Sequence, residues 1–260
     1  MTLASTLAAV SGPPSPGPAD FNLPAIALGV TKPMVLVVLS AVVIFVVYRA
    51  MSRPAAVVPG RLQFAGELSY DFVKGIARDN IGGQEYKKYL PYLFATFLFI
   101  LLNNLYGIIP FLQFPTMSRF GFPVALAGLA WVIYNVAGIM KHGFFGYLKH
   151  TTVPGGTSGP ILIIMVPLEF FSNILVRPFT LALRLFATMF AGHLLIVLFS
   201  LGAQYLIFNS GNALYIVPGI LSFVAGIAIS FLDMLIMFLQ AYVFTLLSAM
   251  YIGGAIADEH

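Results

Sequence analysis

The residues that could do chemistry in this sequence are a few ionisable side chains inside two long apolar blocks. They are Glu169, Arg177, Arg184 and His193 in the fourth apolar block and Asp233 in the fifth. Charged groups inside apolar segments are energetically costly and usually have a function. These five side chains are therefore the first candidates for a functional site.

Polar residues of the fourth block share one narrow stripe when the block is drawn as a helix with 100° per residue. The members of this stripe are Asn173, Arg177, Thr180, Arg184 and Thr188. In the fifth block, Asp233 and Gln240 are seven residues apart and also share a face. Two roles remain open for the stripes: they pair with each other and hold a helix bundle together, or they line a path for ions or protons.

Arg184 favours the second role. Arginine stays protonated in proteins, so it cannot relay protons, but it can repel them. It also forces a nearby carboxylic acid to ionise, because the attraction is roughly 4 kcal/mol at about 4 Å and an effective dielectric constant of about 20. Arg184 therefore suits an electrostatic gate between two proton-accessible regions. Glu169, His193 and Asp233 are too few for a complete relay, so water and an acid on another chain are expected to complete the path.

The composition indicates where these residues lie. The chain has 260 residues, 60% hydrophobic and only 8% charged, with a mean hydropathy of +0.95. Soluble domains are roughly 25% charged, so a soluble enzyme is excluded. The chain has no cysteine and four scattered histidines, which argues against disulfides and metal sites. We expect an all-α, multi-span membrane protein without metal or cofactor.

Five apolar blocks predict about five transmembrane helices, at about residues 34–48, 90–112, 122–140, 160–201 and 213–254. A span needs about 20 residues, and each of the last two blocks has 42. Each long block is either two spans joined by a tight turn or one strongly tilted helix. The lack of Gly and Pro in 227–247 favours two long, tilted helices that form a hairpin, with residues 202–212 as the turn.

Two further segments complete the domain organisation. Residues 1–33 are expected to be a flexible, Pro-rich segment, followed by a single helical membrane domain at 34–260. Within it, residues 61–80 predict an amphipathic helix, with an apolar face of Leu62, Ala65, Leu68, Phe72, Val73 and Ile76. This helix lies either on the inner membrane surface or against another protein.

The basic residues predict the orientation in the membrane. Seven of the 13 Lys and Arg lie between the first two blocks, and Lys141 and Lys149 follow the third. By the positive-inside rule, loops 49–89 and 141–158 are cytoplasmic, which puts the N-terminus outside and the C-terminus inside. The net charge of +4 therefore reflects topology and not nucleic-acid binding.

Three motifs carry a family resemblance. The run from Arg177 to His193, RPFTLALRLFATMFAGH, resembles the signature of subunit a of rotary F-type ATP synthases. Residues 101–110 (LLNNLYGIIP) and 239–244 (LQAYVF) resemble that family's second-span and last-helix motifs. The resemblance covers roughly residues 30–255.

The resemblance implies a static membrane stator that forms two aqueous half-channels against a rotating ring of c subunits, beside the b subunits of a peripheral stalk. It implies a multi-pass protein of a bacterial plasma membrane. In this family, the arginine matched by Arg184 separates the half-channels and deprotonates the ring carboxylate, and the glutamine matched by Gln240 lies near it. His193 and Asp233 match the acid/histidine pair of the outer half-channel.

The inner half-channel is less regular in its match. Glu169 matches an acidic position there, but its spacing to Arg177 is one residue longer than in many members. Asn173 and Arg177 complete the expected proton path. Many members have Asn where this chain has Thr188, and a hydroxyl can keep the same donor and acceptor role.

The leading hypothesis is therefore proton translocation coupled to ATP synthesis. The sequence has no phosphate-binding Gly-Lys-Ser/Thr loop, so the chain is not expected to bind ATP or to be an enzyme on its own. The alternatives are a stand-alone ion-coupled transporter, which would need helices broken at mid-membrane, and a non-conducting scaffold. Asn103 and Asn104 either line water or serve packing. The carried ion, H⁺ or Na⁺, is left open.

Overall fold

The computed structural model describes residues 25–27, 30–51, 60–109, 115–152, 162–209 and 213–257. The expected Pro-rich segment lies mostly outside these residues. Five helices of the described chain are long and apolar enough to cross a membrane, which confirms the all-α class with five candidate spans. A short antiparallel ribbon precedes them, in which β1 (Ala25–Ala27) pairs with β2 (Val30–Thr31).

The first half of the chain forms four helices and one short 3₁₀ turn. They are α2 (Lys32–Met51), α3 (Arg61–Ile81), α4 (Tyr86–Leu105), the 3₁₀ turn η2 (Thr116–Ser118) and α5 (Gly121–Thr152). Helix α4 begins four residues before the predicted span because long lysine side chains can reach from a helix end to the membrane interface. It ends earlier because Gly107 and Pro110 disfavour a continued helix. Helix α5 continues past residue 140 and is interrupted at Gly143, whose φ of 72° suits only glycine.

Each of the two long apolar blocks is one helical stretch, so the alternative of two spans and a tight turn is wrong. The fourth block comprises α6 (Leu162–Phe171), the π-helical turn η3 (Ser172–Val176), α7 (Arg177–Gln204) and a second π-helical turn, η4 (Tyr205–Asn209). The fifth comprises η5 (Ala213–Tyr215) and α8 (Ile216–Ile256). The steep tilt in the membrane stays a prediction.

The turn of the hairpin is shorter than predicted. Helical structure continues to Asn209, so most of the expected linker 202–212 is helix. A glycine inside a helix costs only about 1 kcal/mol. At Gly202 a Cβ would make an ordinary contact of 3.5 Å with Ser222 Oγ, so α8 passes close to this position.

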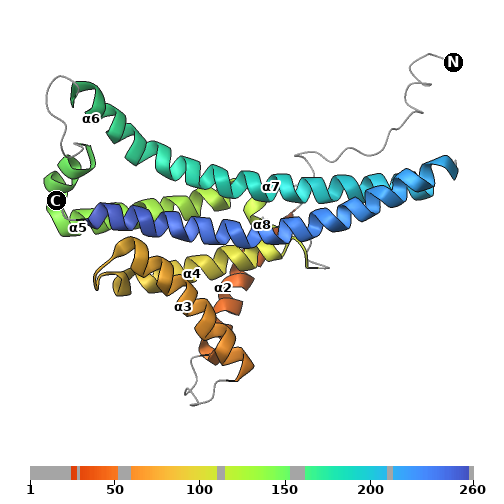
Figure 1. The fold of residues 1–260 in the computed structure, drawn as a ribbon, viewed down its shortest axis with the longest axis horizontal. Helices are drawn as coiled ribbons and strands as arrows, with labels where there is room; N and C mark the ends of the chain where they lie inside the picture. The colour runs from red at the N-terminus through yellow and green to blue at the C-terminus, as the bar shows by residue number, and fades with distance from the viewer. Residues whose placement is uncertain are drawn as a thin grey trace.

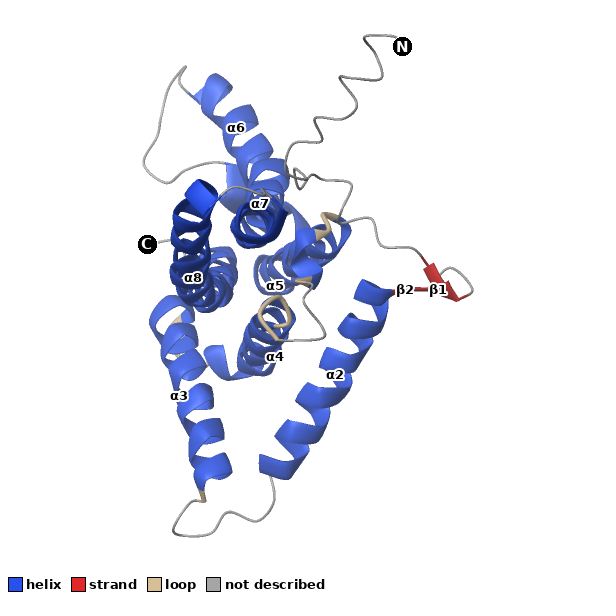
Figure 2. Cartoon of the chain, turned by 90° about the vertical axis from the view of Figure 1, so that its right-hand side faces the viewer, coloured by secondary structure: helices blue, strands red, loops and turns tan. Residues whose placement is uncertain are grey.

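Helices α4, α5, α7 and α8 run along the long axis of the molecule, with α7 and α8 side by side (Figure 1). Seen along that axis, these four helices form a bundle, and α2 and α3 diverge from one side of it (Figure 2). The core of the bundle includes Leu93, Ile100, Met237 and Phe244, all fully buried. At the end opposite the C-terminus, α7 and α8 extend beyond the other helices as a two-helix arm (Figure 1).

Helix α3 uses its apolar face in two ways. Val73, Ile76 and Ala77 are buried, and α3 packs against α4 and α8. Phe64 and Leu68, nearer the start of the helix, are 58% and 61% exposed. The second half of α3 is therefore docked on its own chain, and the first half leaves apolar side chains for lipid or a partner.

Candidate functional site

The register of the α7–α8 hairpin can be read from its glycines. In antiparallel helices, facing residues have a constant sum of residue numbers. This sum is 424 for Gly202 and Ser222, and 425 for Gly226 and Phe199. In each pair, a Cβ placed on the glycine would lie 3.5 Å from the side chain of the other residue. The pairing of Arg184 with Gln240, which the family resemblance implies, predicts a sum of 424. The structure thus puts Arg184 level with Gln240 and Ala241.

Asp233 lies in the same interface at the level of His193. A Cβ on Gly192 would overlap the carboxylate of Asp233, so the two helices meet here through a glycine and an acid. Asp233 is 2% exposed, and both its carboxylate oxygens are buried without a hydrogen-bond partner. His193 is half-buried next to Gly192. The expected pair therefore meets at one level, but His193 donates no hydrogen bond to Asp233.

A second helix brings an unpaired amide to this region. Asn104 of α4 is fully buried, and neither its Oδ1 nor its Nδ2 has a partner. One turn later, a Cβ on Gly107 would lie 3.2 Å from Met237 Cε of α8. Met237 lies between Asp233 and Gln240 on α8, and Nε2 of Gln240 is also buried and unpaired. Asn104, Asp233 and Gln240 thus have buried polar atoms without a hydrogen-bond partner in the described structure, and ordered water usually satisfies such groups.

The two neighbouring asparagines of α4 thus differ in their hydrogen bonds. Asn103 donates to Ser40 Oγ (2.8 Å) and accepts from Thr116 Oγ1 (2.6 Å), which ties α4 to α2 and η2. Packing is therefore the right interpretation for Asn103, whereas for Asn104 both interpretations stay predictions. No signal in the sequence separates two identical adjacent residues. Their environments differ because they point about 100° apart on the helix.

Arg184 lies on the exposed side of α7. Leu181 and Leu185, on the other side of the helix, are buried at 2% and 0% exposure. Among the residues that the structure describes, no ion pair or hydrogen bond involves the guanidinium of Arg184. Its backbone carbonyl accepts from Thr188 Oγ1 at 2.8 Å. Arg184 is thus a fixed positive charge on an outward face, available to a group on another chain.

A second polar cluster surrounds η3, near the C-terminal ends of α5 and α8. The side-chain amide of Asn173 donates to Glu169 Oε2 (3.2 Å) and to the backbone carbonyl of Thr151 (2.8 Å). The guanidinium of Arg177 lies 5.2 Å from the centre of the Tyr251 ring, a cation–π contact. Glu169, Asn173 and Arg177, which the sequence predicted as one path, are therefore brought together here.

The π-helical turn η3 explains how Glu169 and Arg177 share this cluster. Eight residues separate them, which in a regular α-helix is a rotation of about 80°. A π turn absorbs one extra residue, so that they are offset by only about 20°. The unusual spacing in the sequence is thus accommodated by local backbone structure. Such turns often occur at functional sites.

The residues of the predicted polar stripe on the fourth block do not all have the same environment. Asn173 is buried, Arg177 is half-buried, and Thr180 and Arg184 are exposed. The stripe is divided because η3 changes the helical period between Asn173 and the other members. In α8, by contrast, Asp233 and Gln240 are both buried, as their shared face predicts.

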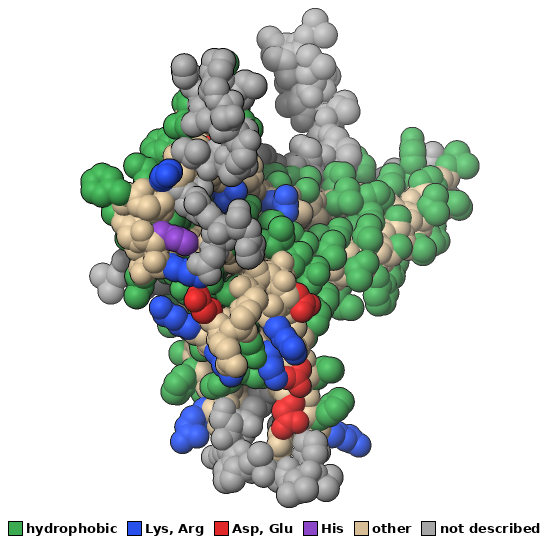
Figure 3. Space-filling view, turned by 60° about the vertical axis from the view of Figure 1, so that its left-hand side comes forward, with side chains coloured by type: hydrophobic (Ala, Val, Ile, Leu, Met, Phe, Trp, Pro, Cys, Tyr) green, Lys and Arg blue, Asp and Glu red, His purple; other side chains and the backbone are tan. Residues whose placement is uncertain are grey.

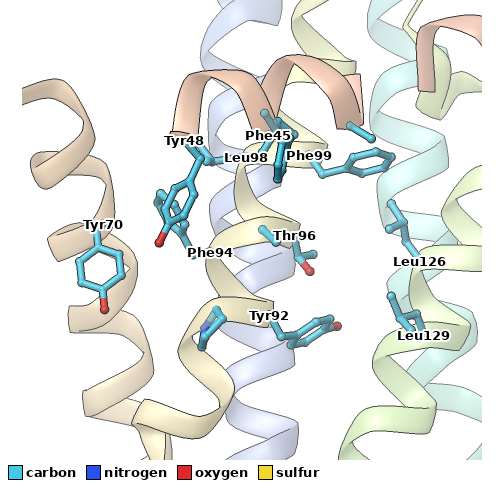
Figure 4. A pocket seen from close by; sticks show the side chains of 14 residues that line it. Phe45, Tyr48, Tyr70, Tyr92, Phe94, Thr96, Leu98, Phe99, Leu126 and Leu129 are labelled. Atoms are coloured by element: carbon cyan, nitrogen blue, oxygen red, sulfur yellow. The ribbon is translucent and has the colours of Figure 1, made fainter. Parts of the chain in front are cut away.

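One cavity lies apart from these residues. It measures about 630 Å³ and is lined by side chains of α2, α3, α4 and α5, including Phe45, Tyr70, Phe94 and Leu126. Figure 4 shows aromatic and leucine side chains around it, with Tyr92 and Thr96 among the polar ones. No charged residue lines this cavity. It is an apolar space between helices, and Asn104, Asp233 and Gln240 are not among the residues that line it.

Comparison with known proteins identifies the family of the chain. The family model described as ATP synthase A chain matches residues 34–253. The chain is 57% identical over 259 residues to ATP synthase subunit a of a Nocardioides species, which covers 94% of both chains. It is 48% identical to that of Pseudarthrobacter chlorophenolicus, again over 94% of both chains, and 41% identical to that of Streptomyces lividans, over 88% of this chain and 80% of the relative.

These matches extend over nearly the whole chain and agree with its five apolar helices. The chain is a multi-pass membrane protein, and the stand-alone transporter is not favoured. It belongs to the family of ATP synthase subunit a, the proton-translocating stator subunit of the F-type enzyme.

Proposed function

We propose that this chain conducts protons through two separate half-channels that meet at Arg184. The outer route runs from His193 and Asp233 past Asn104 and Gln240. The inner route runs through Glu169, Asn173 and Arg177. Along α7, Arg184 is nine residues from His193 and seven from Arg177, or roughly 14 Å and 10 Å. A fixed positive charge between two polar routes blocks direct leakage of protons from one to the other.

The observation that carries this proposal is the exposed guanidinium of Arg184, which has no acidic partner among the residues that the structure describes. A moving carboxylic acid on a partner would be forced to ionise there, release its proton into the inner route, and be reprotonated from the outer one. Small or apolar exposed residues surround Arg184, among them Ala187, Ala191 and Leu239. This face suits a ring of c subunits that carries the carboxylate within an apolar helix.

The distribution of charge supports a cytoplasmic C-terminus in a bacterial plasma membrane. Lys, Arg, Asp and Glu side chains gather over one end of the molecule, and hydrophobic side chains cover the two-helix arm (Figure 3). Arg78, near the end of α3, and Lys87 and Lys88, at the start of α4, are exposed. By the positive-inside rule the charged end is cytoplasmic. The exposed apolar residues of α2 and α3 provide a surface on which the b subunits of the peripheral stalk can pack.

The test is replacement of Arg184 in the whole ATP synthase. Arg184→Ala is expected to abolish ATP synthesis and ATP-driven proton pumping, because nothing then ionises the ring carboxylate, while the complex still assembles. Pumping is measured in inverted membrane vesicles with a pH-sensitive dye. Lys141→Ala serves as control, since the exposed Lys141–Glu85 contact of 3.8 Å contributes little. Normal pumping by Arg184→Ala would refute the proposed gate.

A further inference from the structure

The π-helical turn η3 leaves one backbone carbonyl without a helical partner. In an α-helix the N–H of Arg177 would bond to the carbonyl of Asn173, but here it bonds to the carbonyl of Ser172. The next residue, Pro178, has no N–H to offer. The proline ring would also clash with the carbonyl of the residue four positions earlier, Ile174, in a regular α-helix. This clash explains why the helix widens at this point. The carbonyl of Asn173 therefore receives no donor from residues 177 and 178.

Tyr134 of α5 supplies the missing donor. Its hydroxyl donates to the carbonyl of Asn173 at 2.8 Å. Tyr134 and Asn173 are 3% and 5% exposed, so water does not readily replace this bond. A buried carbonyl without a partner is strongly disfavoured. The tyrosine hydroxyl thus stabilises the π-helical turn from a neighbouring helix.

Tyr134 also contacts the part of the polar cluster around η3 that holds Arg177. Its ring packs edge-on against Tyr251, with centroids 5.7 Å apart, and Tyr251 carries the guanidinium of Arg177 on its face. The amide of Asn173 holds Glu169. One side chain of α5 therefore contacts both the residue that holds Glu169 and the ring that holds Arg177.

We propose that Tyr134 is a positioning residue for proton transfer on the cytoplasmic side. By capping the carbonyl of Asn173, its hydroxyl keeps η3 in the π form, and so keeps Glu169 and Arg177 on one face of the helix. The cluster lies beside the end of α5 that carries Lys149, the side assigned to the cytoplasm by its basic residues. The inference rests on the proposed function, because it assigns Tyr134 to the inner route.

The first experiment compares two hydroxyl deletions in the whole ATP synthase. Tyr134→Phe is expected to lower the maximal rate of ATP-driven proton pumping per assembled complex about fivefold, the effect of one lost hydrogen bond. The KM for ATP and the amount of assembled complex should not change. The control is Tyr147→Phe, because the Tyr147 hydroxyl donates to Asn135 Oδ1 of the same helix at 3.0 Å and not to the carbonyl of Asn173. It should pump like the natural protein.

Two results of this comparison would overturn the inference. One is equal pumping by the two Phe variants. The other is loss of assembled complex in Tyr134→Phe alone, which would assign the hydroxyl a purely structural role.

A second experiment tests the reason for the cap. Pro178→Ala restores a backbone N–H, so the carbonyl of Asn173 no longer needs Tyr134. Adding Tyr134→Phe to Pro178→Ala should then change pumping less than about twofold, because the two changes act on one shared bond. A fivefold further loss in the double variant would overturn the inference. If Pro178→Ala does not assemble, the first pair of variants decides alone.

The outcome of Arg184→Ala separates this inference from the proposed function. If that variant pumps normally, the gate itself fails. If it is inactive and Tyr134→Phe pumps normally, the gate stands and only the role of Tyr134 is lost.

Discussion

Asp233 can lie between α7 and α8 because the residue opposite it is a glycine. Any side chain at position 192 would occupy the volume of the carboxylate. The acid is thereby held in a protein interface, with two buried oxygens that have no hydrogen-bond partner in the described structure. At this scale a residue without a side chain decides where the carboxylate can lie.

Gly192→Ala should therefore displace Asp233. We expect a loss of roughly 1–3 kcal/mol in stability, the usual effect of overpacking, together with slower proton uptake from the outer side. Thermal unfolding of the solubilised complex and proton-driven ATP synthesis measure the two effects. Gly226→Ala in the same hairpin is the control, because its Cβ would make an ordinary 3.5 Å contact with Phe199. Equal behaviour of the two alanine variants would show that Gly192 is not needed to seat the acid.

At the scale of helices, the second half of α3 is held by a close approach to α8. A Cβ on Gly253 would overlap the backbone carbonyl of Asn80 near the end of α3. Aromatic contacts continue the interface, since Phe72 lies 5.6 Å from Phe97 and 6.1 Å from Phe238 between ring centroids. The amphipathic helix is thus fixed to the long helix by backbone contact and aromatic packing.

This close approach predicts unequal effects at two adjacent glycines. Gly253→Ala should separate α3 from α8 and lower stability by roughly 1–3 kcal/mol, because the Asn80 backbone cannot move aside as a side chain would. Gly254→Ala is the matched control, since a Cβ there meets nothing within 4 Å. The measurement is the amount of assembled complex in membranes and its melting temperature. Similar values for both variants would contradict the packing argument.

The helices differ in how far the sequence determines them. Long apolar blocks make the five spans predictable, and the facing sum of 424 predicts the register of α7 and α8. The π-helical turn η3 was not predicted, because an α-helix and a π-helical turn with one added residue have the same apolar composition. Pro178 was a visible signal, since a proline inside a helix needs either a kink or a wider turn. The docking of α3 on α8 depends on contacts between residues that are distant in sequence. The amphipathic pattern of α3 alone therefore did not show what its apolar face packs against.

At the scale of the whole molecule, the charged end and the apolar arm define two sides. Gln84 is exposed in the turn between α3 and α4, and Phe120 is exposed just before α5. Helix α4 and the turn η2 separate them along the chain. The orientation derived from basic residues assigns Gln84 to the cytoplasm and Phe120 to the outside.

Cysteine labelling tests this orientation directly, because the chain has no cysteine of its own. Gln84→Cys should react with a membrane-impermeant maleimide only in inverted vesicles. Phe120→Cys should react only in intact cells or right-side-out vesicles. Mass tagging of this chain reads out the reaction. Labelling of both positions from one side would reverse or refute the assigned topology.

The two-helix arm differs mechanically from the rest of the subunit. In the described residues 191–208 and 214–232, only Ala203 and Gly219 are buried, whereas α4 and α5 back α7 and α8 around Arg184. A pair of helices without lateral support bends more easily than a bundle. If a neighbouring ring turns against this face, we expect the arm to bend more than the segment around Arg184, which other helices support.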